Sequence, residues 1–165
     1  MEAGPANQAI IARATVDDAE ILALIKRAFA PVARQYGVPS LPPLDETLAE
    51  HLARYEDSVV FKATYDGAIV GSVQGRLDSD GVCHVARLVV DPAFQRRGIG
   101  RALMVALERS LPQARRFELF TGHQSEETIR LYRSLGYQET RRQRQSDALT
   151  LVWLEKARTA GTEGP

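Results

Sequence analysis

The residues best suited to chemistry in this sequence are two glycines and three arginines just before a predicted helix, within QRRGIGRALMVALERS at 95–110. The first turn of a helix leaves backbone N–H groups unpaired and carries a partial positive charge. Gly98 and Gly100 let the preceding backbone curl until successive N–H groups point at one place. Formal charge comes from the arginines, Arg96, Arg97 and Arg101. These features predict a binding site for the phosphates of a di- or triphosphate ligand.

Two common phosphate-binding motifs do not fit this stretch. A Walker loop needs Gly-Lys followed by Ser or Thr, which 99–101 does not supply. A Rossmann fingerprint needs a third glycine, and Leu103 occupies its place, although Glu118 lies 20 residues beyond Gly98, near where a ribose-binding acid belongs. The structural alternative is a plain solvated turn before a helix.

The elements that must position this turn are predicted from hydrophobic periodicity and turn residues. Strands are expected over 9–14, in the hairpin 58–78 with its turn at Asp66-Gly67, and over 82–90, 115–120, 137–143 and 148–156. Helices are expected after Asp17 or Asp18, over 46–56, over about 100–111 and over 125–136. Residues 36–43 are predicted to be a loop. The order indicates an α+β protein with one crossover region, without an internal repeat.

Polar side chains predict where these helices begin. Asp17 or Asp18 is expected to cap the first helix, Asp45 the second and Ser125 the last. Pro31 is expected to weaken or end the first helix. One face of that helix is apolar, at Ile21, Leu24, Ile25, Ala28 and Phe29.

With these elements, the sequence resembles the GNAT superfamily of acyl-CoA-dependent N-acetyltransferases. The central motif of that family, Gln/Arg-x-x-Gly-x-Gly/Ala after an apolar strand, matches residues 95–100 at every fixed position. The stretch SEETIRLYRSLGYQE, 125–139, is similar to a later family helix with Leu-Tyr and Gly-Tyr landmarks. The resemblance spans about residues 10–155. It implies the GNAT fold, a mixed and mostly antiparallel sheet of about six to seven strands, flanked by about four helices, with splayed strands that hold the cofactor.

The resemblance implies acetyl-CoA as co-substrate and assigns residues to it. Backbone groups of Leu88 and Val90 would bind the pantetheine arm as an added strand would. An N–H near Val89 or Val90 would stabilise the oxyanion. The remaining expected contacts are Gln95, Arg96, Arg97, Gly98, Ile99, Gly100, Arg101 and Ser125. Ser125 stands where many relatives have Asn, a longer side chain.

Tyr132 aligns with the tyrosine of the family's Leu-Tyr landmark, which implies that it is the general acid. A phenol can donate a proton to a departing thiolate. Helical periodicity alone favours packing instead, because Ile129, Tyr132 and Leu135 lie near one stripe.

The base has several candidates. His84 lies eleven residues before Gln95, where a histone-modifying branch of the superfamily has a glutamate, and histidine is a residue type suited to general-base catalysis. Glu118 is the alternative and His123 a third candidate. Water chains are a further alternative. Another branch has its glutamate where Phe120 stands here, so that role does not transfer.

The sequence favours neither a cysteine nucleophile nor a metal site. Cys83 and His84 are neighbours on a strand and point to opposite faces, so Cys83 is expected to be a buried apolar filler. The three histidines, His51, His84 and His123, lack the spacing of metal ligands, so no metal is expected.

Length, composition and charge indicate the number of domains and the classes of partner to expect. The 165 residues, 44% hydrophobic, are expected to form one acetyltransferase domain over 9–157, with flexible ends at 1–8 and 158–165. Lys+Arg and Asp+Glu both number 21, a balance that does not call for nucleic acid, and no apolar run suits a membrane. A single cysteine and the lack of a signal-peptide pattern favour the cytoplasm.

The expected function is transfer of an acetyl group from acetyl-CoA to a primary amine by direct attack in a ternary complex. The alternative is an inactive acyl-CoA-binding sensor or interaction module. The acceptor is expected to bind beside residues 29–51. In this segment Tyr36, Asp45, Glu46 and Glu50 could contact a cation or a planar ring. The alternative is that these four side chains form a solvated helix surface. Small molecules and protein amines both stay open as acceptors, and the family often forms homodimers.

Overall fold

The computed structural model describes residues 8–158, whose strands hydrogen-bond in the order β1-β2-β3-β4-β5-β7-β6. The chain divides into two units. The described part of the first unit comprises 8–74 and 87–110, and that of the second comprises 75–86 and 111–158. The strands β3 (Ala68–Leu77) and β4 (Val82–Val90) contribute residues to both.

The first unit begins with β1 (Ile10–Arg13), which pairs antiparallel with β2 (Ser58–Tyr65). Asp66 and Gly67, at φ 54° and 85°, form the turn from β2 to β3 that the Asp-Gly pair predicts. Between β1 and β2 the chain forms α1 (Glu20–Tyr36), α2 (Pro42–Asp45), α3 (Leu48–Ala53) and the 3₁₀ turn Arg54–Glu56.

The apolar stripe of α1 packs on the strands of the first unit, as its periodicity predicts. Ile21, Leu24 and Ile25 are at most 1% exposed and form a cluster with Ala14, Val60, Ile69 and Val89. Ala28 and Phe29 pack against its border. Burial of this stripe removes apolar surface from water and fixes α1 on β2 and β3.

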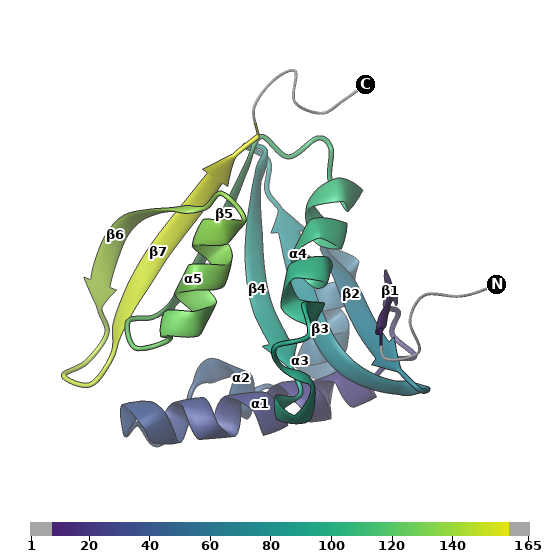
Figure 1. The fold of residues 1–165 in the computed structure, drawn as a ribbon, viewed down its shortest axis with the longest axis horizontal. Helices are drawn as coiled ribbons and strands as arrows, with labels where there is room; N and C mark the ends of the chain where they lie inside the picture. The colour runs from purple at the N-terminus through teal and green to yellow at the C-terminus, as the bar shows by residue number, and fades with distance from the viewer. Residues whose placement is uncertain (1–7, 159–165) are drawn as a thin grey trace. The chain divides into compact units, whose positions relative to one another are not determined.

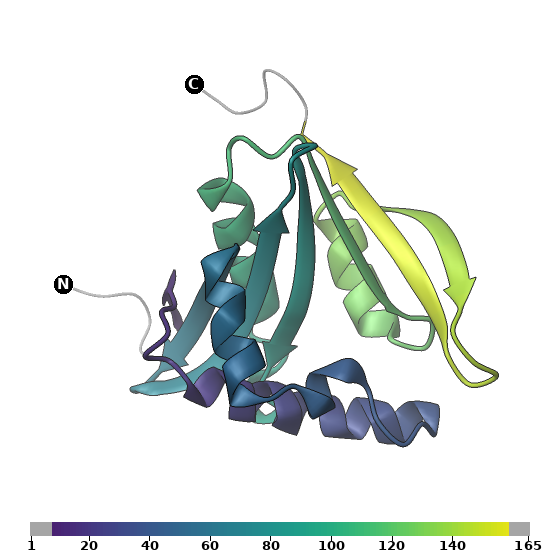
Figure 2. The same ribbon diagram turned by 180° about the vertical axis from the view of Figure 1, so that it is seen from behind.

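The helix α4 (Ile99–Ser110) lies on the face of β2 and β3 opposite α3 (Figures 1 and 2). Gly71 on β3 permits this close packing, because a Cβ there would lie 3.1 Å from side-chain atoms of Ile99 and Leu103. Leu103, Met104 and Leu107 are fully buried. The start of α4 is therefore held firmly against the sheet.

The second unit contains β5 (Arg116–Gly122), α5 (Glu126–Ser134), β6 (Gln138–Arg144) and β7 (Thr150–Ala157). Val82–His84 of β4 pair in parallel with Arg116–Glu118 of β5. β7 lies between β5 and β6 and is antiparallel to both. The helix α5 covers one face of these strands (Figure 1), where Tyr132 and Tyr137 contact each other and are buried.

Several predicted helix boundaries are wrong. Asp18 does not cap α1: its carboxylate accepts the backbone N–H of Thr15 and binds Lys62 on β2. Pro31 does not end α1, which continues to Tyr36. The start of α3 is capped by Thr47 rather than Asp45, and the predicted loop over 36–43 contains the beginning of α2.

Ser125 is the residue before α5, as predicted, but its side chain makes no capping hydrogen bond. Within 8–158 no helix is long and apolar enough to cross a membrane. The predicted flexible ends lie outside the described residues, apart from Gln8 and Arg158. Arg158 donates from Nε to the carbonyl of Ala114 at 2.8 Å.

Candidate functional site

The chain leaves β4 through a turn that Asp91 fixes. Its backbone N–H donates to the carbonyl of Val70 on β3, and its carboxylate accepts the N–H of Ala93 at 2.9 Å. Arg27 of α1 forms an ion pair with the same carboxylate at 3.1 Å. The hydrogen bond from the Ala93 N–H lowers the pKa of Asp91, and the contact with Arg27 lowers it further. Burial alone would raise this pKa, but its effect is the smaller one. The strand end and α1 therefore hold the turn that follows.

The residues from Gln95 to Gly98 are exposed and contain two left-handed positions, Arg96 at φ 66° and Gly98 at φ 80°. A Cβ at Gly98 would meet no atom within 4 Å, so the backbone angle, and not crowding, requires glycine there. Alternation of left-handed and right-handed residues turns successive N–H groups to one side. Gly98 thus lies beside open space at the end of an exposed turn.

Ile99 begins α4 directly after this turn, and Gly100 lies within the first helical turn with an ordinary helical backbone. Gly100 therefore adds no left-handed position to the turn. No acidic residue lies in the first turn of α4. The positive end of the helix dipole and the turn 95–98 thus meet, which fits the phosphates of a diphosphate ligand.

The side chains of Arg97 and Gln95 contact neighbouring groups of the first unit. The guanidinium of Arg97 lies 4.9 Å from the ring centroid of Phe94 and 5.8 Å from that of Tyr65. Gln95 donates from Nε2 to the carbonyl of Val90 at 3.4 Å. One backbone acceptor of the predicted pantetheine strand is therefore already used by the chain itself.

The predicted thioester strand, Leu88–Val90, follows an irregularity that sequence patterns did not indicate. Arg87, inside β4, has a left-handed backbone at φ 57°. Val89 is buried in the core of the first unit, whereas Leu88 and Val90 are half-buried. Such a position locally breaks the alternation of a strand and re-aims its backbone groups.

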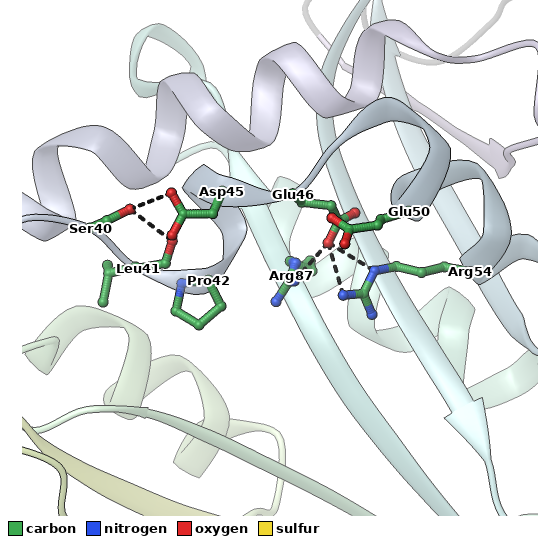
Figure 3. Close-up of a pocket in the computed structure, with 8 residues that line it drawn as sticks. All are labelled: Ser40, Leu41, Pro42, Asp45, Glu46, Glu50, Arg54 and Arg87. Carbon is green, nitrogen blue, oxygen red and sulfur yellow. Dashed lines mark hydrogen bonds and ion pairs between the residues drawn. The ribbon is translucent and has the colours of Figure 1, made fainter.

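A pocket of about 540 Å³ opens in the first unit beside Arg87 (Figure 3). It is lined by Ser40, Leu41, Pro42, Asp45, Glu46, Glu50, Arg54 and Arg87. Ser40 donates its hydroxyl to Asp45 at 2.9 Å, and Glu50 accepts the backbone N–H of Thr47. Asp45, Glu46 and Glu50, expected on the acceptor side, lie together here. Tyr36, the fourth of that group, is buried in α1 and does not line the pocket.

Four charged or titratable residues form what we call the Glu46 cluster: Glu46, His51, Arg54 and Arg87. Arg87 Nη2 lies 2.9 Å from Glu46 Oε1, and Arg54 Nη2 lies 2.8 Å from the same oxygen. Burial alone would raise the pKa of Glu46, but hydrogen bonds and charges from both arginines lower it overall. Sequence reasoning missed both arginines, although an arginine in the apolar strand VCHVARLVV signals a buried acidic partner.

The second unit brings the two predicted bases together. His84 and Glu118 are directly paired on β4 and β5, with His84 Nδ1 3.8 Å from Glu118 Oε1. His84 Nε2 lies 2.8 Å from Asp78 Oδ2. The hydrogen bond with His84 and backbone N–H groups hold the pKa of Asp78 at about 2. The carboxylate of Asp78, to which sequence reasoning gave no role, thus orients His84.

The other predicted chemical residues also lie in the second unit. Tyr132 on α5 is 5% exposed, and burial raises the pKa of its phenol, which therefore stays protonated. His123 accepts the backbone N–H of Thr150 on Nδ1 at 3.1 Å. Cys83 is fully buried, as expected. Within 8–158 no group of three acidic, histidine or cysteine side chains is arranged to hold a metal ion.

Comparisons with known proteins extend this description. A sequence model of the Acetyltransferase (GNAT) family matches residues 22–137. A comparison with curated proteins found no match. The ribosomal-protein-S18-alanine N-acetyltransferase of Escherichia coli has a similar solved structure, 20% identical with a TM-score of 0.76, covering 95% of this chain and 99% of that one.

Two further solved structures contain ligands. PaiA N-acetyltransferase from Thermoplasma acidophilum, in complex with coenzyme A, is 14% identical with a TM-score of 0.74, covering 91% of this chain and 99% of that one. A Salmonella typhimurium structure with its cofactor acetyl-CoA is 20% identical with a TM-score of 0.74, covering 90% and 93%.

These likenesses confirm the predicted fold, a mixed sheet of seven strands flanked by helices within the described residues. The family model covers more than half of the chain and includes Leu88–Val90, the turn 95–98 and α5. The chain therefore belongs to the GNAT family of acetyltransferases, as the motif at 95–100 predicts.

Proposed function

We propose that this protein transfers an acetyl group from acetyl-CoA to a primary amine within a ternary complex. The observation that carries the proposal is the turn 95–98, with Arg96 and Gly98 left-handed, joined to the first turn of α4. Backbone donors and a positive helix end suit the pyrophosphate of coenzyme A. Coenzyme A and acetyl-CoA in two structures of similar fold give independent support.

The thioester arm is proposed to lie along Leu88–Val90, the segment that leads into the glycine turn. A backbone N–H near Val89 or Val90 would then donate to the acetyl carbonyl. As the amine nitrogen attacks, the C–N bond forms and charge builds on that oxygen, where a fixed donor lowers the barrier. Collapse of the intermediate breaks the C–S bond and releases coenzyme A as a thiolate.

Two proton transfers complete the reaction. The proton lost by the amine is proposed to go to His84, with Glu118 as the neighbouring alternative. The departing thiolate is proposed to take its proton from Tyr132, whose raised pKa keeps the phenol in the donor form. Asp78 would keep His84 oriented through the contact at Nε2, which leaves Nδ1 to act.

The amine is proposed to enter through the pocket beside Arg87 (Figure 3). Arg87 lines this pocket and directly precedes Leu88, so the pocket borders the proposed thioester strand. Asp45 and Glu50, at its lining, supply negative charge that attracts an ammonium group. Both a small-molecule amine and a protein amine fit this description.

The test is a thermal-shift screen of acyl-CoAs followed by an amine panel with detection of released thiol. We expect acetyl-CoA to stabilise the protein and at least one primary amine to give thiol release that depends on both substrates. Stabilisation without turnover across a broad panel would instead support an acyl-CoA-binding sensor or interaction module. Absence of any acyl-CoA binding would overturn the proposal.

A further inference from the structure

The left-handed backbone of Arg87 needs an explanation that the glycine turn does not provide. Within the described residues, the non-glycine residues with positive φ are Asp66, Arg87 and Arg96, and of these Arg87 alone lies inside a strand. A side chain with a Cβ disfavours this conformation, which persists where surrounding contacts hold it. The contacts of the Arg87 side chain are therefore the first place to look for what holds this conformation.

The side chain of Arg87 is held by a buried carboxylate (Figure 3). Its Nη2 donates to Glu46 Oε1 at 2.9 Å, and Arg54 donates to the same oxygen from Nε at 2.9 Å. The side chain of Glu46 is 3% exposed. In such a position charge-assisted hydrogen bonds are strong, and their geometry is hard to change without leaving a buried charge unpaired.

His51 closes the cluster from the interior. It is fully buried on α3, and its Nδ1 lies 3.4 Å from Glu46 Oε2 without hydrogen-bond geometry. Burial lowers the pKa of His51, so the ring is neutral near pH 7 and does not compete with the arginines for the carboxylate. The two guanidinium groups, one of them from β4, thus share Glu46 Oε1 as their acceptor.

We propose that Glu46 is a positioning residue for acetyl transfer. It acts through Arg87: by holding that side chain, it keeps the backbone in the left-handed conformation that aims the groups of Leu88–Val90. The inference rests on the proposed function, which places the thioester on those residues. It also links the segment that lines the amine pocket to the strand that binds the acyl group.

The first test compares Arg87→Gly with Arg87→Ala. Both variants lose the guanidinium, but glycine adopts a positive φ readily and alanine does not. We expect Arg87→Ala to lower kcat by about 30-fold and Arg87→Gly to recover at least about fivefold of that loss, with the Kd for acetyl-CoA within about threefold. Equal kcat values for the two variants would overturn the proposal.

Asp66→Ala is the matched control. Asp66 has nearly the same backbone angle, φ 54°, but lies in the turn from β2 to β3. Alanine there has the same backbone cost but leaves no buried carboxylate with a missing partner, so melting temperatures are measured for both variants. We expect its kcat to stay at the wild-type value. A loss as large as that of Arg87→Ala would mean that reduced stability alone explains both, and would overturn the proposal.

A double-mutant cycle tests whether Glu46 acts through Arg87. Glu46→Gln keeps the side-chain volume and removes the charge. We expect it to lower kcat by about 10-fold in the wild-type background and by less than about twofold in Arg87→Gly, because the backbone no longer depends on the ion pair. Equal effects in both backgrounds would overturn the proposal. If Glu46→Gln fails to fold, the proposal is tested by comparing Arg87→Ala with Arg87→Gly, with Asp66→Ala as the control.

Amide hydrogen exchange separates this inference from the proposed function, because it needs no substrate. We expect Glu46→Gln to speed exchange at Leu88–Val90 while exchange in β7 is unchanged. Unchanged exchange at Leu88–Val90 in a wild-type enzyme that turns over amines would overturn the positioning role alone. A wild-type protein without turnover, whatever the exchange shows, would overturn the proposed function.

Discussion

The starts of two helices of the first unit, α3 and α4, differ in what pairs with their backbone N–H groups. Both α3 and α4 begin with backbone N–H groups that have no partner within the helix. At α3 the chain supplies the partners itself: Thr47 accepts the N–H of Glu50 at 3.1 Å, and Glu50 accepts the N–H of Thr47 at 2.9 Å. This reciprocal arrangement is a capping box, and it closes the helix start.

The start of α4 has a different chemistry. The residues before it are glycine and arginine, two of them left-handed, and no acidic side chain lies in its first turn. The comparison teaches that the two starts differ in the source of negative charge. At α3 a glutamate of the chain provides it, whereas at α4 we infer that the phosphates of coenzyme A provide it.

Gly100→Asp should give the largest effect, because it places at α4 the acidic group that α3 already has. Aspartate suits a first helical turn, so the fold should be kept. An added charge about 4 Å from a phosphate at a surface site costs about 4 kcal/mol, or about 1000-fold in Kd. Calorimetry with acetyl-CoA checks this, with Gly100→Asn as the neutral control. An unchanged Kd in the folded variant would break the comparison.

His84→Ala tests whether chemistry and binding are separate. If His84 accepts the amine proton, its loss should lower kcat/KM by about 100-fold, the usual scale of general-base catalysis. Much of that loss should be recovered at higher pH, where the amine is already neutral. The Kd for acetyl-CoA should stay the same. A pH-independent wild-type rate, or an unaffected variant, would move the role to Glu118 or to water.

Thr47→Ala removes the N-cap of α3 and tests whether the starts of α3 and α4 are independent. Loss of an N-cap hydroxyl typically costs about 1 kcal/mol of stability. We expect that decrease in urea unfolding, with no change in the Kd for acetyl-CoA. Weaker acetyl-CoA binding by this variant would show that the two helix starts are not independent.

Lowering the pH should have a smaller effect on the free energy of unfolding, and this effect should arise from His51 on α3. Burial lowers the folded-state pKa of His51 below its unfolded value of about 6.5, so the unfolded chain takes up the proton first as pH falls. The stability contributed by neutral His51 is therefore complete above about pH 6.5 and declines below it. Unfolding free energies at pH 7 and pH 5 should differ less in His51→Leu than in the wild type. Equal differences would contradict this origin.

The sequence predicts the start of α4 well because its signal is local. Gly98 requires a positive φ, and the apolar period of 99–110 follows at once, so neighbouring residues determine the turn and the helix. The hairpin at Asp66-Gly67 is predicted for the same reason. Each depends on contacts a few residues apart.

The wrong predictions depend on distant partners. Asp18 is a good capping residue by type, but Lys62, 44 residues away, draws its carboxylate to β2. Arg87 leaves regular strand geometry beside Glu46, 41 residues earlier in the chain. The pairing of His84 with Glu118 depends on the parallel register of β4 and β5, which hydrophobic patterns do not specify.

The central claim, that the turn before α4 binds the pyrophosphate, is tested most directly by changing the ligand instead of the protein. Calorimetry compares acetyl-CoA with S-acetylpantetheine, which keeps the thioester arm and lacks the phosphates together with the adenosine they carry. Two charge-assisted hydrogen bonds of about 1.5 kcal/mol each correspond to about 100-fold in affinity, so S-acetylpantetheine should bind at least that much more weakly. Gly100→Asp should bring the two affinities close together. Equal affinity of the wild-type protein for both ligands would contradict the account.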